Sequence, residues 1–174
     1  MTFVWILALL VVAFIVVVAL RPAEFRVERS ATMRAPASAV FAQVNDFQNW
    51  RAWSPWEGLD PALKRTYEGP QAGTGAIYAW QGNKDVGEGR MTILESRPAE
   101  LVRIRLEFFK PFAATNTAEF RFEPQGEDTT VRWSMSGHNN FFAKAIGLFI
   151  NMDRMVGGMF EQGLSRMKAV VESR

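Results

Sequence analysis

The chain has no cysteine and only one histidine, His138, among its 174 residues. The lack of cysteine excludes disulfides, thiolate metal sites and cysteine nucleophiles together. Histidine is the most frequent acid–base catalyst, but the one present lies in "SGHNN", where glycine and asparagine indicate a loop. No group of histidine and carboxylate residues has the spacing of metal ligands. We therefore predict no metal site, no cofactor and no catalytic residue.

Charge is missing from the first twenty residues, and no basic run occurs in the rest. All 20 Lys and Arg and all 18 Asp and Glu follow residue 20, with a net charge of +2. The two signs are interspersed, whereas nucleic-acid-binding domains concentrate basic residues on one face. We expect no nucleic-acid partner.

The uncharged beginning contains one continuous apolar run, residues 3–20, "FVWILALLVVAFIVVVAL". Eighteen helical residues extend roughly 27 Å, close to the thickness of the hydrocarbon core of a bilayer. A cleaved signal peptide is disfavoured, since no Lys or Arg precedes the run and no A-x-A pattern follows it. We predict an N-terminal transmembrane helix over residues 1–21 and one domain over residues 22–174.

The distribution of arginine predicts which side of the membrane holds the domain. Only the α-amino group precedes the apolar run, and the positive-inside rule assigns the more basic flank to the cytoplasm. The domain is therefore expected on the cytoplasmic side of a single-pass membrane protein. The arginines that follow the run are Arg21, Arg26, Arg29 and Arg34.

The periodicity of the remaining chain predicts a sheet enclosed by two helical segments. A first strand around residues 26–33 is followed by a helix with apolar residues at one face, from Val40 to Phe47. Residues 63–139 alternate with period two between turn residues, which indicates about six antiparallel strands with one apolar face. Residues 152–171 then form one long amphipathic helix that can cover that face.

Four segments resemble a known family, the SRPBCC superfamily of START-like domains and within it the polyketide cyclase/dehydrase-like group. The segments are "MRAPASAVFAQVNDFQNWRAWSPW", "GTGAIYAWQGNKDVGEGRMTI", "TTVRWSMSG" and "MVGGMFEQGLSRMKAVVE", spread over residues 26–172. The resemblance implies an α+β helix-grip fold, in which a curved antiparallel sheet wraps around the long C-terminal helix. It also implies a deep apolar pocket between them.

Half of the six tryptophans fall in "NDFQNWRAWSPW", residues 45–56, which this fold would place at the mouth of the pocket. We expect Trp50 to pack inward, while Trp53 and Trp56 form aromatic walls with their N–H groups toward water. Close approach to the last helix is expected at Gly157, Gly158 and Gly163. The predicted ligand-binding residues are Trp53, Trp56, Tyr78, Trp80, Phe108, Phe120, Trp133, Met135, Met155, Met159 and Phe160.

These features favour a membrane-anchored protein that binds a hydrophobic or amphipathic small molecule, such as a lipid, without catalysing a reaction. Two alternatives stay open. A cyclase/aromatase-like enzyme predicts a titratable pair facing into the pocket, and a protein-interaction module predicts a closed core without a cavity. The apolar segment 139–151 is either a short helix packed on the domain or a lid at the membrane interface. The sequence does not indicate whether the protein has a protein partner.

Overall fold

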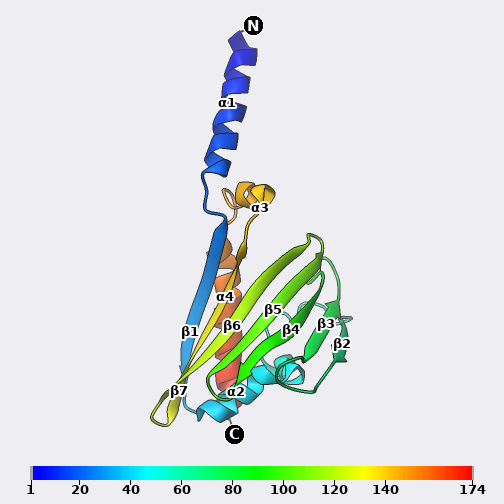
Figure 1. Ribbon diagram of the computed structural model, residues 1–174, viewed down its shortest axis with the longest axis vertical. Helices are drawn as coiled ribbons and strands as arrows, with labels where there is room; N and C mark the ends of the chain where they lie inside the picture. The colour runs from blue at the N-terminus through cyan, green and yellow to red at the C-terminus, as the bar shows by residue number, and fades with distance from the viewer. Residues whose placement is uncertain (1, 174) are drawn as a thin grey trace.

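The computed structural model describes residues 2–173 and shows one seven-stranded antiparallel sheet in the order β1-β7-β6-β5-β4-β3-β2 (Figure 1). Because β1 occupies one edge and β2 the other, the chain crosses the sheet once and then returns strand by strand. The crossing segment consists of helix α2 (Ala37–Asn45) and the 3-10 helix η1 (Phe47–Ala52). The strands are β1 (Glu24–Met33), β2 (Lys64–Glu68), β3 (Ile77–Gln81), β4 (Glu88–Arg97), β5 (Leu101–Lys110), β6 (Ala114–Gln125) and β7 (Asp128–His138).

The two faces of the sheet follow the alternation of the sequence. On β5, Val102 and Ile104 are fully buried, whereas Arg103 forms an ion pair with Glu119 of β6 at 3.1 Å on the opposite face. Strands β5 and β6 pair these two residues directly. The prediction of an antiparallel sheet with one apolar and one wet face is confirmed.

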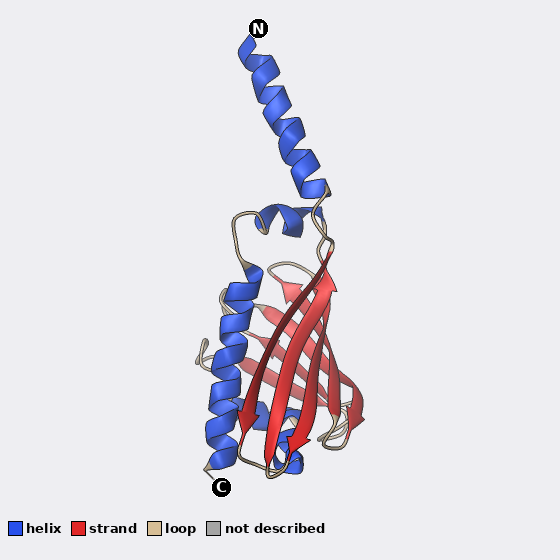
Figure 2. Cartoon of the chain, turned by 90° about the vertical axis from the view of Figure 1, so that its left-hand side faces the viewer, coloured by secondary structure: helices blue, strands red, loops and turns tan. Residues whose placement is uncertain are grey.

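Helix α4 (Met152–Glu172) packs along the apolar side of the sheet and contacts β1 (Figure 2). Its buried residues include Phe160, Gly163, Leu164 and Met167. The long helix and its position were expected from the amphipathic pattern, and together with the sheet they confirm the helix-grip fold.

Two glycines of α4 are needed because a side chain lies directly against the helix. A Cβ on Gly163 would lie 2.9 Å from Cζ3 of Trp133, and one on Gly157 would overlap the guanidinium of Arg29. The guanidinium binds the carboxylates one turn before and one turn after Gly157, on Asp153 and Glu161, at 3.0 and 2.6 Å. Gly158 has open space around it, so the expected close approach holds for two of the three glycines.

The tryptophan stretch caps the end of helix α2. The indole N–H groups of Trp50 and Trp53 donate to the carbonyls of Val44 and Gln43, each at 3.0 Å, and the side-chain amide of Asn49 donates to Ala42 at 2.8 Å. The last carbonyls of a helix lack partners within the helix, and burial without a partner would be costly. Two of the three tryptophans therefore satisfy buried backbone groups, a role that periodicity did not predict.

Helix α1 (Thr2–Ala19) projects away from the domain, and the short helix α3 (Phe141–Ile146) lies between it and the end of the sheet (Figure 2). Within residues 2–173 no helix is both long and apolar enough to cross a membrane. The transmembrane helix predicted for residues 1–21 is therefore not supported. The helix has 18 residues, somewhat fewer than the roughly 20 that a spanning helix usually needs.

Candidate ligand-binding site

An inner cavity of about 230 Å³ lies between α4, the segment after η1 and the apolar face of the sheet. A water molecule occupies roughly 30 Å³ of liquid, so the cavity exceeds a few water volumes. Its walls are mostly apolar and aromatic, which is typical of small-molecule sites. Seven of the predicted ligand-binding residues line it: Trp56, Tyr78, Trp80, Phe108, Trp133, Met135 and Phe160.

A stack of three aromatic rings forms the wall beneath α4. The ring of Trp133 lies between those of Phe160 and Phe120, with centroids 4.0 and 4.8 Å apart. Trp56 meets Trp133 edge to face at 5.8 Å. Because each ring packs against its neighbours, the wall is already formed without a ligand.

The other four predicted residues do not line the cavity. Trp53 and Phe120 are fully buried in the core, Trp53 with its N–H bound to Gln43 and Phe120 behind Trp133. Met155 is 54% exposed, and Met159 lies one helical turn further along the same face of α4. The lining residues of α4 are instead Val156 and Phe160. Trp50 packs inward as expected and is buried, and it also contributes to the lining.

The cavity also contains a polar cluster that the sequence did not reveal. The hydroxyl of Tyr78 donates to Oε1 of Glu57 at 2.9 Å, and Nε of Arg65 donates to Oε2 of Glu57 at 2.8 Å. Both Glu57 and Tyr78 line the cavity, and only 11% of the Glu57 side chain is exposed. The three residues come from a loop, β2 and β3, so no periodic pattern connects them.

The surroundings of Tyr78 keep its hydroxyl protonated at neutral pH. Burial, together with the charge of Glu57 and the hydrogen bond to it, raises the pKa of Tyr78 well above its usual value. The hydrogen bond that Arg65 donates to Glu57 also raises the pKa of Arg65. Tyr78 is therefore a neutral hydroxyl whose oxygen retains lone pairs for a polar group of a ligand.

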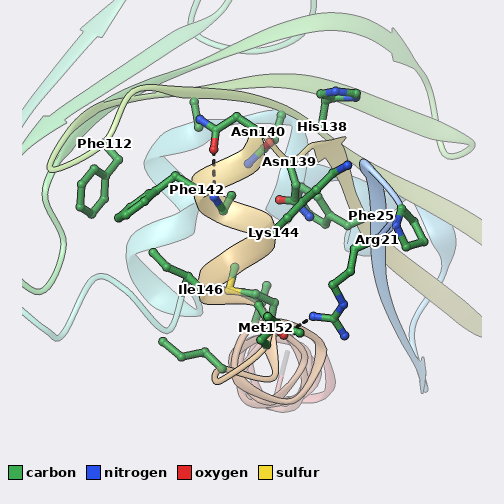
Figure 3. Close-up of a pocket in the computed structure, with 18 of the residues that line it drawn as sticks. Arg21, Phe25, Phe112, His138, Asn139, Asn140, Phe142, Lys144, Ile146 and Met152 are labelled. Atoms are coloured by element: carbon green, nitrogen blue, oxygen red, sulfur yellow. Dashed lines mark hydrogen bonds between the residues drawn. The ribbon is translucent and has the colours of Figure 1, made fainter. Parts of the chain in front are cut away.

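A larger opening of about 880 Å³ lies beside the inner cavity, and Figure 3 shows residues that line it. Phe108, Met135 and Val156 line both spaces and form the partition between them. Helix α3 forms one wall, and it begins where the Asn140 side chain accepts a hydrogen bond from the Ala143 N–H at 2.9 Å. We call this opening the mouth. The apolar segment 139–151 thus includes a short helix, as the first alternative predicted, and this helix lines the mouth without burying any of its residues.

A curved antiparallel sheet around a C-terminal helix, with an apolar cavity between them, defines a helix-grip domain of the ligand-binding type. Residues 24–172 match the model of the family described as polyketide cyclase / dehydrase and lipid transport. The chain belongs to this family. The resemblance found in the sequence is thereby confirmed for the domain, without extending to residues 1–21.

Solved structures show the same fold at low sequence identity. The Zhui aromatase/cyclase from Streptomyces sp. R1128 is 15% identical with a TM-score of 0.61, over 87% of this chain and 95% of that chain. The ginseng major latex-like protein 151 from Panax ginseng is 9% identical with a TM-score of 0.62, over 86% and 99%. A protein from Nitrosospira multiformis is 17% identical with a TM-score of 0.62, over 84% and 96%. No curated protein matches the chain.

Proposed function

We propose that the protein binds an amphipathic small molecule with a long apolar body, without transforming it, and that helix α1 attaches it to a membrane. The observation that carries the proposal is the inner cavity with aromatic walls and one polar cluster at Glu57, Tyr78 and Arg65. The cavity also counts against an interaction module with a closed core.

Apolar burial would supply most of the affinity, at roughly 25 cal/mol for each Å² of ligand surface removed from water. A ligand longer than the inner cavity would extend through the partition into the mouth. Met135, at this partition, is unbranched and can change rotamer to let a chain pass. The hydroxyl of Tyr78 would then bind a polar group at the inner end of the ligand.

The experiment is native mass spectrometry of the full chain in detergent, followed by organic extraction and identification of the bound molecule. Val156→Phe would fill the partition and is expected to lower occupancy by a fluorescent fatty acid at least tenfold, since the ligand loses its path into the apolar cavity. Met155→Phe is the matched control, because Met155 is adjacent on α4 but does not line the cavity. Equal binding by wild type and Val156→Phe contradicts the proposed site.

One observation favours the second candidate, a cyclase/aromatase-like enzyme. The pair Glu57–Tyr78 is titratable and faces into the cavity, which is what catalysis on a bound chain requires. Both oxygens of Glu57 already accept hydrogen bonds, and this argues for a positioning role. Incubation with the extracted ligand and mass analysis separates the two candidates, since only the enzyme changes the mass or bonding of the ligand.

Membrane attachment is supported by the surface of α1. Five consecutive residues, 3–7, are each more than half exposed, and all five are apolar. Leaving such a surface in water is unfavourable, and the arginines after α1 favour the cytoplasmic side for the domain. The full chain is expected to stay with membranes after alkaline extraction, whereas a chain beginning at residue 22 is released. Protease digestion of intact and inverted vesicles would test the orientation.

A further inference from the structure

We propose that the mouth rests on the surface of the lipid bilayer, so that the ligand enters the cavity directly from the membrane and is itself a membrane lipid. This inference rests on the proposed ligand-binding function. It adds the source of the ligand, its chemical class and the face of the domain that meets the membrane.

The first observation is a cluster of exposed apolar side chains around the mouth. Phe112, Phe142 and Phe149 are 66%, 57% and 82% exposed. They come from the turn between β5 and β6, from α3 and from the segment before α4, and all three line the mouth. The rings of Phe112 and Phe142 lie 5.7 Å apart. Single exposed apolar residues are common on protein surfaces, but a cluster of them around one opening indicates a surface that contacts another molecule or a membrane when the protein functions.

The second observation is that this cluster lies at the same end of the domain as α1. The guanidinium of Arg21, just after α1, donates to the carbonyl of Gly147 at 2.6 Å, and Lys144 of α3 lies 3.5 Å from the carbonyl of Ala19. Figure 2 shows α3 directly below the base of α1. Whatever medium surrounds the base of α1 therefore also meets α3 and the mouth.

The exposure of α1 identifies that medium. Residues 3–7 are consecutive, so their side chains cover more than one full turn of the helix, and each is more than half exposed. A protein partner covers one stripe of a helix, whereas lipid surrounds it on all sides. A bilayer into which α1 inserts without crossing it is thus the occupant that fits both α1 and the aromatic cluster.

The charges beside the mouth also fit a lipid surface. Arg21 and Lys144 line the mouth and hydrogen-bond backbone carbonyls, and within residues 2–173 neither forms an ion pair with a carboxylate. Basic side chains at the base of a membrane helix attract the phosphates of anionic headgroups. The arrangement of aromatic side chains with basic neighbours is typical of surfaces that enter the membrane interface.

Helix α3 is the element best suited to open the mouth. None of its six residues is buried, and a segment with few buried apolar contacts opens locally at low free-energy cost. Contact of Phe142 with the acyl chains would draw α3 toward the bilayer and uncover the path past Met135. The lipid could then pass into the cavity with its chain shielded from water throughout.

Depth measurements test the docking without any ligand. Because the chain has no cysteine, Phe149→Cys in the full chain gives a single site for an environment-sensitive fluorophore. In vesicles of phosphatidylcholine and phosphatidylglycerol, spin-labelled lipids should quench this fluorophore strongly. Leu59→Cys is the control, since Leu59 is also exposed but does not line the mouth, and it should not be quenched. Equal, weak quenching at both positions overturns the proposal, as does shielding at residue 149 by protein without lipid quenching.

Loading measurements test the route of the ligand. In the double variant Phe142→Ser/Phe149→Ser, loading of a fluorescent lipid from the vesicle is expected to slow about tenfold, because two apolar contacts with the bilayer are lost. Loading from detergent should be unchanged, and Leu59→Ser should behave as wild type. Unchanged loading from vesicles overturns the route while leaving ligand binding in place. Failure to load from either source instead refutes the proposed function, and the depth measurement still decides the docking.

Discussion

The ring of Trp133 on β7 lies parallel to that of Phe160 on α4, with centroids 4.0 Å and planes 10° apart. This contact joins the sheet to the helix that covers it and forms part of the cavity wall. It is possible only because residue 163, near the ring of Trp133, has no side chain. Stability and the shape of the cavity therefore depend on the same small region.

Gly163→Ala is expected to destabilise the domain by about 1–3 kcal/mol, because the new methyl group would press on the Trp133 ring and on Pro55. Gly158→Ala is the matched control on the same helix. It has open space and should stabilise the protein by up to about 1 kcal/mol through its helix propensity. Urea denaturation of both variants measures the difference, and equal effects would contradict the close contact.

Trp53→Phe is expected to lower stability by about 1–3 kcal/mol, since the buried carbonyl of Gln43 would lose its hydrogen bond. Phenylalanine keeps much of the apolar contact, so the loss of stability measures mainly the hydrogen bond that Trp53 donates to the end of α2. Trp56→Phe should change stability less and ligand affinity more, because Trp56 lines the cavity. Denaturant titration and a binding assay on both variants would show this opposite pattern, and a stability loss confined to Trp56→Phe would disprove the capping role.

Alkaline titration of the two tyrosines is expected to show both ionising above the usual pKa of about 10. Burial is the main cause for Tyr67, and for Tyr78 burial is reinforced by Glu57. Since the pKa of Tyr78 is raised in the folded state, its contribution to stability is complete below the unfolded pKa and is lost as pH rises above it. Absorbance near the phenolate band follows the titration.

Glu57→Gln should lower the pKa of Tyr78, because it removes the nearby negative charge. Tyr78→Phe should remove one of the two transitions altogether and identify which is which. An unchanged titration of Tyr78 in Glu57→Gln would contradict the hydrogen bond between Tyr78 and Glu57 in the cavity.

Acid should weaken the contact between β1 and α4. The hydrogen bond from Arg29 lowers the pKa of Asp153, so its contribution to stability is present above the unfolded pKa of about 3.9 and is lost as pH falls through the folded value. Asp153→Asn is expected to lower stability at neutral pH and to flatten its decline in acid. Glu127→Gln, in the exposed turn between β6 and β7, is the control and should leave the acid limb as in wild type. Thermal unfolding between neutral pH and pH 3 measures both.

The fold was predictable because its signals are local. Alternation on β5 and the amphipathic stripe of α4 each follow from neighbouring residues, and a sheet with one apolar face needs a cover. The stripe also indicated Met155 and Met159, which do not line the cavity. They lie only about 100° around the helix from Val156 and Phe160, which do. An amphipathic stripe locates the buried face of a helix only to within about one residue. This precision is too low to distinguish the residues that line the cavity from their solvent-exposed neighbours.

The polar cluster could not be predicted, because long-range register brings its members together. Tyr78 of β3 donates to Glu57 of the loop before β2, and Arg65 of β2 reaches the same carboxylate from the strand that pairs with β3. Likewise, the indole caps on α2 depend on how η1 folds back on the helix. Sequence patterns report which side chains are apolar, but not which buried acceptors need a donor.

The pairing of β1 with β7 has a consequence for how the domain forms. Glu24 pairs with His138, so the first strand has no partner until β7, which ends at His138, has been synthesised. Contacts between such distant residues slow folding, because the chain must lose the entropy of the intervening loop before the two strands can pair. Until β7 and α4 arrive, β1 is an unpaired edge next to the apolar α1. We expect the newly made chain to depend on a chaperone or on early capture of α1 to avoid aggregation during this interval.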